Sequence, residues 1–79
     1  MLIDVRTAEE YRKGHIAGSV NIPLAQIRYF QIPNKSAPIS VCCKGGGRAA
    51  QAKEILEARG YTNVTNIGGI SGRPLTTGD

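Results

Sequence analysis

The sequence predicts an α/β domain with a mostly parallel sheet. Two short apolar, β-prone runs, at residues 2–5 and 39–42, are each followed by a helix-start signal and a segment of helical pattern. Strand, loop and helix is therefore the local order at both places, which favours parallel strands joined through helices. The predicted strands are residues 2–5, 19–21, 39–42 and 63–66, and the predicted helices are residues 8–13, 24–30 and 48–59.

The ends of the predicted helices carry specific signals. Thr7 and Glu10 have the spacing of a capping box, so the first helix is expected to begin just after Thr7. Residues 24–30 have the pattern of a short amphipathic helix with Ile27 turned inward. In the last helix, small and apolar residues recur at three- and four-residue spacing, and Gly60 follows where a left-handed C-terminal cap is expected.

Length and composition are typical of one small globular domain, residues 1–79. A chain of 79 residues with 41% hydrophobic residues is only just long enough to bury a core. The net charge of +4 suits anionic substrates, but the basic residues are scattered and the aromatic residues are few, so no nucleic-acid partner is expected. No apolar run is long enough to span a membrane, and we expect a monomer with no membrane partner.

The chain has two cysteines, Cys42 and Cys43, which are neighbours in the sequence. A disulfide between them would close a strained ring, and there is no second cysteine pair for a zinc site, so we expect no metal. Side chains alternate along a strand, so Cys42 should point to the opposite face from Cys43. Cys42 is therefore expected to be a small buried hydrophobe, and a role as a second reactive thiol beside Cys43 is less favoured.

Residues 43–48, with the sequence Cys-Lys-Gly-Gly-Gly-Arg, are suited to an anion cradle around a thiolate. Three glycines let the loop amides turn inward, and the N-terminus of the following helix adds a partial positive charge at the same place. This field and the cations Lys44 and Arg48 favour the thiolate of Cys43 over its thiol. Glycine-rich turns also occur where no ligand binds, but the combined pattern favours a nucleophilic role for Cys43.

Two separated parts of the chain resemble the signatures of rhodanese domains. The first is residues 2–6, Leu-Ile-Asp-Val-Arg, followed by Glu10-Tyr11, Gly14-His15-Ile16 and residues 18–23. The second is the loop at residues 43–48, followed by residues 52–56, residues 60–64 and Gly68-Gly69. The resemblance spans nearly the whole chain and is closest to small rhodaneses of the phage-shock type. It implies a three-layer α/β/α fold with its active site at the carboxyl end of the sheet.

The resemblance also implies a sulfurtransferase without a cofactor. The thiolate of Cys43 would attack the outer sulfur of a donor such as thiosulfate, and the resulting persulfide would pass its sulfur to cyanide or to a thiol. The partners that it implies are therefore a small anionic sulfur donor and a thiol or cyanide acceptor. The loop residues expected to form the substrate-binding wall are Lys44, Gly45, Gly46, Gly47 and Arg48. Lys44 and Arg48 are the two expected to hold the sulfonate end of thiosulfate.

Four charged or titratable side chains lie within these motifs. Three are expected to be structural, and the partner of the fourth, Arg48, is not decided by the sequence. An arginine at a helix start faces an unfavourable dipole, so Arg48 needs a partner, which is either an anion or a carboxylate such as that of Asp4. The resemblance implies that Asp4 and Arg6 support the first strand beside the loop. It also places His15, the only histidine, in a scaffold turn, and a cysteine already ionised by its loop needs no general base.

Two other functions share some of these features. Tyrosine-phosphatase-like enzymes use a longer loop than the four residues between Cys43 and Arg48, so sulfur chemistry is favoured over phosphate or arsenate chemistry. A rhodanese-like sulfur carrier or regulatory binding module with little turnover remains an alternative. Ala49 stands where a serine or threonine is common in the family, which favours reduced activity. No signal peptide is visible, and the compartment, cytoplasmic or periplasmic, stays open.

Overall fold

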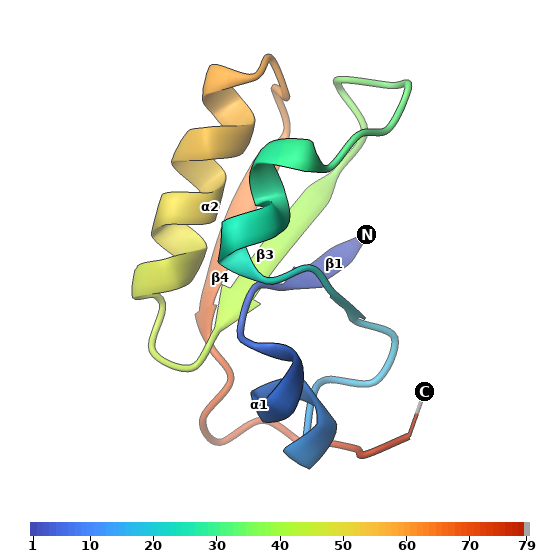
Figure 1. Ribbon diagram of the computed structural model, residues 1–79, viewed down its shortest axis with the longest axis vertical. Coiled ribbons are helices and arrows are strands. Elements are labelled where there is room, and N and C mark those ends of the chain that lie inside the picture. The colour runs from blue at the N-terminus through green and yellow to red at the C-terminus, as the bar shows by residue number, and fades with distance from the viewer. Residues whose placement is uncertain (79) are drawn as a thin grey trace.

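A computed structural model describes residues 1–78 and shows a four-stranded sheet with helices packed around it (Figure 1). The elements along the chain are β1 (Leu2–Asp4), α1 (Ala8–Lys13), β2 (Val20–Asn21), the 3₁₀ helix η1 (Leu24–Tyr29), β3 (Ile39–Cys43), α2 (Gly47–Ala58) and β4 (Val64–Gly69). The strand order is β2-β1-β3-β4, and every neighbouring pair is parallel. The predicted α/β class with a mostly parallel sheet is confirmed.

The site region is defined by how the helices lie around this sheet. Helices η1 and α2 lie side by side over one face, while α1 lies beyond the carboxyl ends of the strands (Figure 1). Strand β3 is central, with β1 on one side and β4 on the other, so its last residue, Cys43, reaches the middle of the carboxyl edge. Parallel sheets of this kind place their ligand sites at that edge.

The core lies between the sheet and the helices on its covered face. It contains Ile3, Val5, Ile27, Phe30, Ile39, Val41, Cys43, Ala49, Ala52, Leu56, Tyr61 and Val64. Alternate residues of β3 enter it, namely Ile39, Val41 and Cys43, as the period of a strand requires. Cys43 is therefore anchored on the same face as α2, the helix that follows its loop.

Helix α1 begins as predicted. The Thr7 hydroxyl accepts a hydrogen bond from the Glu10 amide at 3.2 Å, and a Glu10 carboxylate oxygen accepts one from the Thr7 amide at 3.1 Å. Both halves of the capping box are therefore present, which satisfies amides that have no partner inside the helix. This box also fixes where the Glu10 side chain starts, one turn into α1.

The segment predicted as a helix at residues 24–30 is a 3₁₀ helix, which ends at Tyr29. Ile27 is fully buried, so the inward-facing residue was predicted correctly. Pro23 precedes the segment, and the amides of Gln26 and Phe30 bond to carbonyls three residues back at 2.8 and 3.1 Å. Short connectors between a proline and an extended segment commonly adopt this tighter winding.

The second half of the fold differs from the prediction mainly in β4. Helix α2 spans Gly47–Ala58, and the left-handed Gly60, with φ +96°, follows it as expected. The predicted strand at residues 63–66 runs instead over Val64–Gly69, because Gly68 and Gly69 continue the pairing with β3 after a register shift. Glycine is a weak strand signal, which hid this extension. The remaining strand ends and the ends of α2 lie within one residue of their predicted positions.

Candidate active site

The Cys43 side chain lies at the N-terminus of α2. Its Sγ accepts hydrogen bonds from the Gly46 amide at 2.9 Å and from the Ala49 amide at 3.4 Å. Gly46 is the N-cap residue of α2 and has no side chain to cap the helix, so the sulfur takes the place of the usual capping oxygen. Two amides and the positive end of the helix dipole therefore face Sγ, which favours negative charge on the sulfur.

The loop at residues 43–48 needs glycine at particular positions. Gly46 has φ +99°, a left-handed conformation that side chains rarely adopt. A Cβ on Gly45 or Gly47 would meet nothing within 4 Å, so neither is required by crowding. The close approach comes instead from β4, because a Cβ on Gly69 would collide with the Lys44 carbonyl oxygen and lie 3.1 Å from the Gly45 Cα. Gly69 therefore lets the end of β4 support the loop.

Asn66 adds a second link between β4 and the loop. Its side-chain amide donates to the Gly46 carbonyl at 3.4 Å, and its side-chain oxygen accepts from the Gly68 amide at 2.7 Å. Sequence reasoning did not identify Asn66 as a site residue. The Gly68-Gly69 pair entered the prediction only through the family resemblance. The sequence did not reveal that Gly69 lies against the loop.

Cys42 is on the other face of β3, as strand alternation predicted. It is fully buried and does not belong to the core cluster that contains Cys43. Burial, and then the nearby Asp4 carboxylate, raise the pKa of the Cys42 thiol to about 11. Cys42 is therefore a neutral thiol at physiological pH, while its neighbour Cys43 faces helix amides.

The partner of Arg48 is Glu10. The two guanidinium nitrogens donate to the two carboxylate oxygens at 2.7 and 3.0 Å, so the pair is bidentate. A carboxylate partner for Arg48 was one of the two predicted possibilities, but Asp4 is not that carboxylate, because its oxygens are bound to Arg6. Arg48, and then the Thr7 amide, lower the pKa of Glu10 to about 2. Helix α1 is thereby tied to the start of α2.

Asp4 and Arg6 form a buried ion pair at the carboxyl end of β1. Arg6 Nη2 lies 2.7 Å from Asp4 Oδ2, and Arg6 Nε is 3.0 Å from both carboxylate oxygens. The Arg6 amide also donates to Asp4, and Nη2 donates to the Gly14 carbonyl at 2.6 Å. The hydrogen bond to Asp4 raises the pKa of Arg6. The pair joins β1 to the turn after α1, and β1 pairs with β3 up to Cys42.

His15 has no contact with Cys43. Its ring contacts the segment in which His15 itself lies and the end of the described chain. Its ring stacks on Tyr11 with the two planes 5° apart, and its ring nitrogens lie 2.7 Å from the Tyr11 carbonyl oxygen and 2.5 Å from that of Gly78. Both nitrogens therefore have backbone partners. This agrees with the predicted scaffold role, and no contact places His15 at the sulfur of Cys43.

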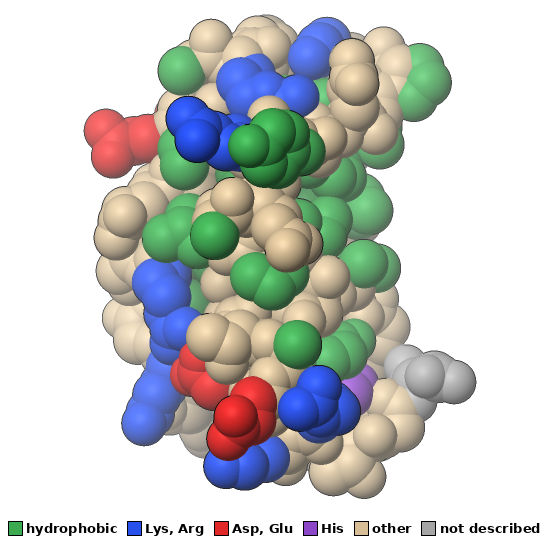
Figure 2. All heavy atoms as spheres, in the orientation of Figure 1, with side chains coloured by type: hydrophobic (Ala, Val, Ile, Leu, Met, Phe, Trp, Pro, Cys, Tyr) green, Lys and Arg blue, Asp and Glu red, His purple; other side chains and the backbone are tan. Residues whose placement is uncertain are grey.

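A cleft of about 310 Å³ borders the site at the end of the molecule that carries α1. It is lined by Arg6, Glu10, Lys13, Lys44, Ile70, Ser71, Gly72, Arg73 and Leu75. Lys44 directly follows Cys43, and the Ile70 amide donates to the Cys43 carbonyl at 3.0 Å. Figure 2 shows charged side chains of both signs gathered at this end. Lys44 was predicted at the site from the sequence, whereas Arg73 was not.

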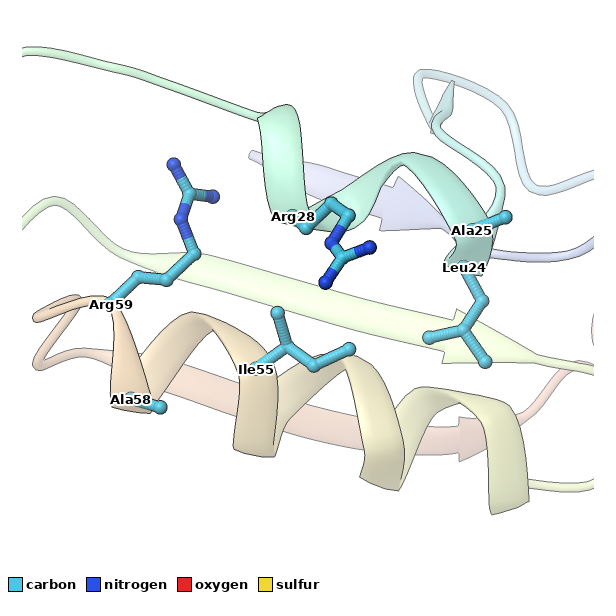
Figure 3. Close-up of a pocket in the computed structure, with 6 residues that line it drawn as sticks. All are labelled: Leu24, Ala25, Arg28, Ile55, Ala58 and Arg59. Atoms are coloured by element: carbon cyan, nitrogen blue, oxygen red, sulfur yellow. The ribbon is translucent and has the colours of Figure 1, made fainter.

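A second and larger hollow, of about 520 Å³, lies between η1 and α2. Arg28 and Leu24 from η1 and Ile55 from α2 extend into it, with Arg59 near its end (Figure 3). Its lining residues include no thiol, acid or histidine, so it holds no nucleophile or general base. Cys43 does not line this hollow, so the hollow is separate from the candidate site at the start of α2.

Among residues 1–78, no group of three or more histidine, cysteine, aspartate or glutamate side chains is arranged to hold a metal ion. No helix within the described residues is long and apolar enough to cross a membrane.

Comparison with known proteins gives consistent matches. Residues 1–72 match the model of the rhodanese-like domain family. Thiosulfate sulfurtransferase PspE of Escherichia coli is 42% identical over 71 residues, which are 86% of this chain and 68% of that protein. The putative sulfur carrier protein YrkF of Bacillus subtilis is 34% identical over 67 residues, which are 84% of this chain but only 36% of that protein.

Solved structures agree with these sequence matches. A solved structure of a rhodanese with anions from Escherichia coli superposes with a TM-score of 0.87 and 39% identity, covering 98% of this chain and 96% of that one. The human single-domain sulfurtransferase TSTD1 superposes with a TM-score of 0.78 and 28% identity, covering 86% of this chain and 74% of that one. Family model, sequence and fold thus agree over nearly the whole length, and the chain belongs to the rhodanese-like domain family.

Proposed function

We propose that this protein is a sulfurtransferase that carries a sulfane sulfur as a persulfide on Cys43, with thiosulfate as its donor. The observation that carries the proposal is the placement of Cys43 Sγ against the amides of Gly46 and Ala49 at the start of α2. Relatives named as sulfurtransferases and as a sulfur carrier support sulfur transfer in the broad sense.

The first half of the reaction forms the persulfide. The Cys43 thiolate attacks the outer sulfur of thiosulfate, the sulfur–sulfur bond of the donor breaks, and sulfite leaves with the bonding electron pair. The loop amides stabilise the negative charge on the sulfur throughout, because they are already aligned and need no reorganisation. In the second half, cyanide or a thiolate attacks the outer sulfur, and the electron pair returns to Sγ.

The two cations of the loop have different roles in this proposal. Arg48 is held by Glu10 in a bidentate pair, so its charge is balanced and its role is to support the start of α2. Lys44 is exposed and has no ion pair among the described residues, so its ammonium group is free to bind the sulfonate end of the donor. The predicted substrate-binding wall therefore divides into Lys44, the loop amides and a supporting Arg48.

The test is the intact mass of the reduced protein before and after incubation with thiosulfate, and again after cyanide. We expect the wild type to gain one sulfur atom and to lose it on addition of cyanide, with thiocyanate formed. Cys43→Ser should gain nothing, and Cys42→Ser is the matched control that should behave as the wild type does. A gain of sulfur by Cys43→Ser, or no gain by a folded wild type, would reject the persulfide on Cys43.

A sulfur carrier with little turnover is the second candidate. The observation that favours it is the burial of Cys43, which is only 1% exposed and therefore open to few reactants. The similarity to a putative sulfur carrier points the same way. Steady-state thiocyanate formation separates the two candidates. An enzyme turns over many times, whereas a carrier loads one sulfur per molecule and then releases it slowly to cyanide. A regulatory docking role would survive Cys43→Ser.

A further inference from the structure

The hollow between η1 and α2 has the size and the lining of a small-molecule site. Its volume of about 520 Å³ lies within the range of about 300–1,000 Å³ that is usual for ligand pockets. Aliphatic side chains and two arginines line it, namely Leu24, Ala25, Ile55, Ala58, Arg28 and Arg59. A pocket of this kind combines an apolar wall with a few polar groups that orient a ligand.

The apolar and the charged side chains lie toward different ends of the hollow. Helices η1 and α2 run in the same direction, and Figure 3 shows Leu24 and Ala25 at the end where η1 begins and Arg59 at the end where α2 stops. Arg28 comes from the last turn of η1, and Ile55 of α2 lies between the two ends (Figure 3). The hollow is therefore aliphatic at one end and positively charged toward the other.

Both arginines have N–H groups left for a ligand. Arg28 is exposed and Arg59 is half-buried, and among residues 1–78 neither forms an ion pair. Arg59 Nη1 donates to the Ile27 carbonyl at 2.9 Å, which links the end of α2 to η1 and leaves the other guanidinium nitrogens without a carboxylate. The described residues that line the hollow include no acid, so nothing in its lining balances the two positive charges.

This arrangement suits an organic anion with an aliphatic chain. A guanidinium binds a carboxylate through two parallel hydrogen bonds, whereas the aliphatic end of the hollow has no donor or acceptor side chain for an inorganic ion. The volume corresponds to about seventeen water molecules at about 30 Å³ each, which is room for a carboxylate with a chain of about eight carbons.

We propose that the hollow between η1 and α2 binds an aliphatic carboxylate of medium chain length. The carboxylate lies between Arg28 and Arg59, and the chain lies along Leu24 and Ile55 (Figure 3). Binding is non-covalent and uses no residue of the loop that holds Cys43. This inference is therefore independent of the proposed sulfur transfer, and each can fail without the other.

The test titrates isotope-labelled protein with octanoate, below the concentration at which octanoate forms micelles, and follows the backbone amide resonances. Three matched compounds separate the parts of the ligand: acetate has the charge without the chain, octanol has the chain without the charge, and octylamine has the opposite charge. We expect octanoate to shift resonances of η1 and of the second half of α2. Its dissociation constant should be about three- to tenfold below that of octanol, the range for one charged contact at an exposed site, and acetate and octylamine should bind more weakly than octanol.

Two variants change the charge of the hollow. Arg28→Ala should raise the dissociation constant of octanoate by about three- to tenfold and leave that of octanol unchanged. Ala58→Glu adds an acid at an exposed position of α2 where glutamate is a good helix former, and it should abolish octanoate binding and favour octylamine. Arg12→Ala is the matched control, because it removes the same charge from an exposed position on α1, outside the hollow. Urea unfolding shows that each variant is folded.

Several results would overturn the proposal. Equal affinity of the wild type for octanoate and octanol would show that the arginines do not select a charge. Shifts confined to residues 44–47 would place the anion at the loop of Cys43 instead. An octanoate affinity that is unchanged in folded Arg28→Ala would leave Arg28 the purely structural role of a cation near the end of a helix. Binding to vesicles of anionic phospholipid, with no response to octanoate, would replace the small ligand with a lipid surface.

Discussion

Cys42 and Cys43 are chemically identical neighbours that occupy opposite environments. Strand alternation sends one thiol to a site beside the Asp4 carboxylate and the other to the start of α2, where two amides donate to it. The field around each sulfur, rather than its residue type, decides which is suited to nucleophilic chemistry. The sequence predicted this difference, because neighbouring residues of a strand point to opposite faces and Cys43 lies where the predicted strand meets the glycine-rich loop.

This difference predicts that Cys42 is inert in the folded protein. In Cys43→Ser, Cys42 is the only thiol, and with its pKa raised to about 11 only about one molecule in ten thousand holds a thiolate at pH 7. Alkylation by iodoacetamide at pH 7 should therefore be negligible in buffer and rapid in concentrated urea, as followed by intact mass. Fast alkylation of the native variant would contradict the assigned environment of Cys42.

The Glu10–Arg48 pair predicts a pH dependence of stability. The pKa of Glu10 falls from 4.5 to about 2 on folding, so the pair stabilises the fold above about pH 4.5 and this contribution is lost as pH falls toward 2. Glu10→Gln keeps the capping side chain but removes the charge. It should lower the free energy of unfolding by about 0.5–1 kcal/mol at pH 7, because both side chains are one-third exposed, and by much less at pH 2, where about half of the Glu10 carboxyl groups of the folded protein are protonated.

Urea unfolding of wild type and Glu10→Gln at several pH values measures this difference. Glu9→Gln is the matched control, because Glu9 forms only an exposed ion pair with Lys13 at 3.4 Å. Its difference from the wild type should be small at every pH. A Glu10→Gln difference that persists unchanged at pH 2 would show that the charge of Glu10 is not the source of its contribution.

At the scale of the elements, the sequence predicted which segments form strands and helices better than how they end. Capping signals at Thr7 and Gly60 marked two helix ends because they act through local hydrogen bonds. The extension of β4 depends on its pairing with β3, an element distant in the sequence, which local patterns do not encode. The pairing of Glu10 with Arg48 could not be predicted from local patterns either, because the two residues lie 38 positions apart in the sequence.

The contact between β4 and the loop predicts opposite effects for two glycine substitutions. Gly69→Ala places a methyl group against the backbone of Lys44 and Gly45, which cannot move without shifting the loop. It should cost about 1–3 kcal/mol and slow the loading of sulfur. Gly47→Ala adds a methyl group where nothing lies within 4 Å, at the first residue of α2. Its unfolding free energy should stay unchanged or rise by up to about 1 kcal/mol.

Urea midpoints measure the stability of both glycine variants, and intact mass after brief exposure to thiosulfate measures their loading. The comparison isolates position from composition, because each variant adds one methyl group in place of a glycine hydrogen. A Gly69→Ala protein as stable as Gly47→Ala would mean that β4 does not hold the loop at this point.

At the scale of the whole molecule, the site depends on a framework that the small core alone does not provide. Asp4 and Arg6 join β1 to the turn after α1, Glu10 joins α1 to α2, and Gly69 brings β4 against the loop. These links converge at the carboxyl edge, where Cys43 lies. The resemblance to a family predicted a supporting role for Asp4 and Arg6, but the residues alone did not show that they pair with each other.

The buried pair predicts that single substitutions in this framework threaten folding. Asp4→Ala leaves the Arg6 guanidinium, which is 8% exposed, without its carboxylate, and breaking such a pair costs about 3–5 kcal/mol. A domain of 79 residues has a total stability of only about 4–12 kcal/mol, so Asp4→Ala should lower the thermal midpoint severely or leave the chain unfolded. The double variant Asp4→Leu with Arg6→Met removes both charges and should recover much of the loss, because no buried charge remains unpaired. Circular dichroism melting of both variants, with Glu57→Ala as a control for an exposed pair, measures these effects. If Asp4→Ala melts within a few degrees of the wild type, as Glu57→Ala should, the pair is not part of the framework that holds the site.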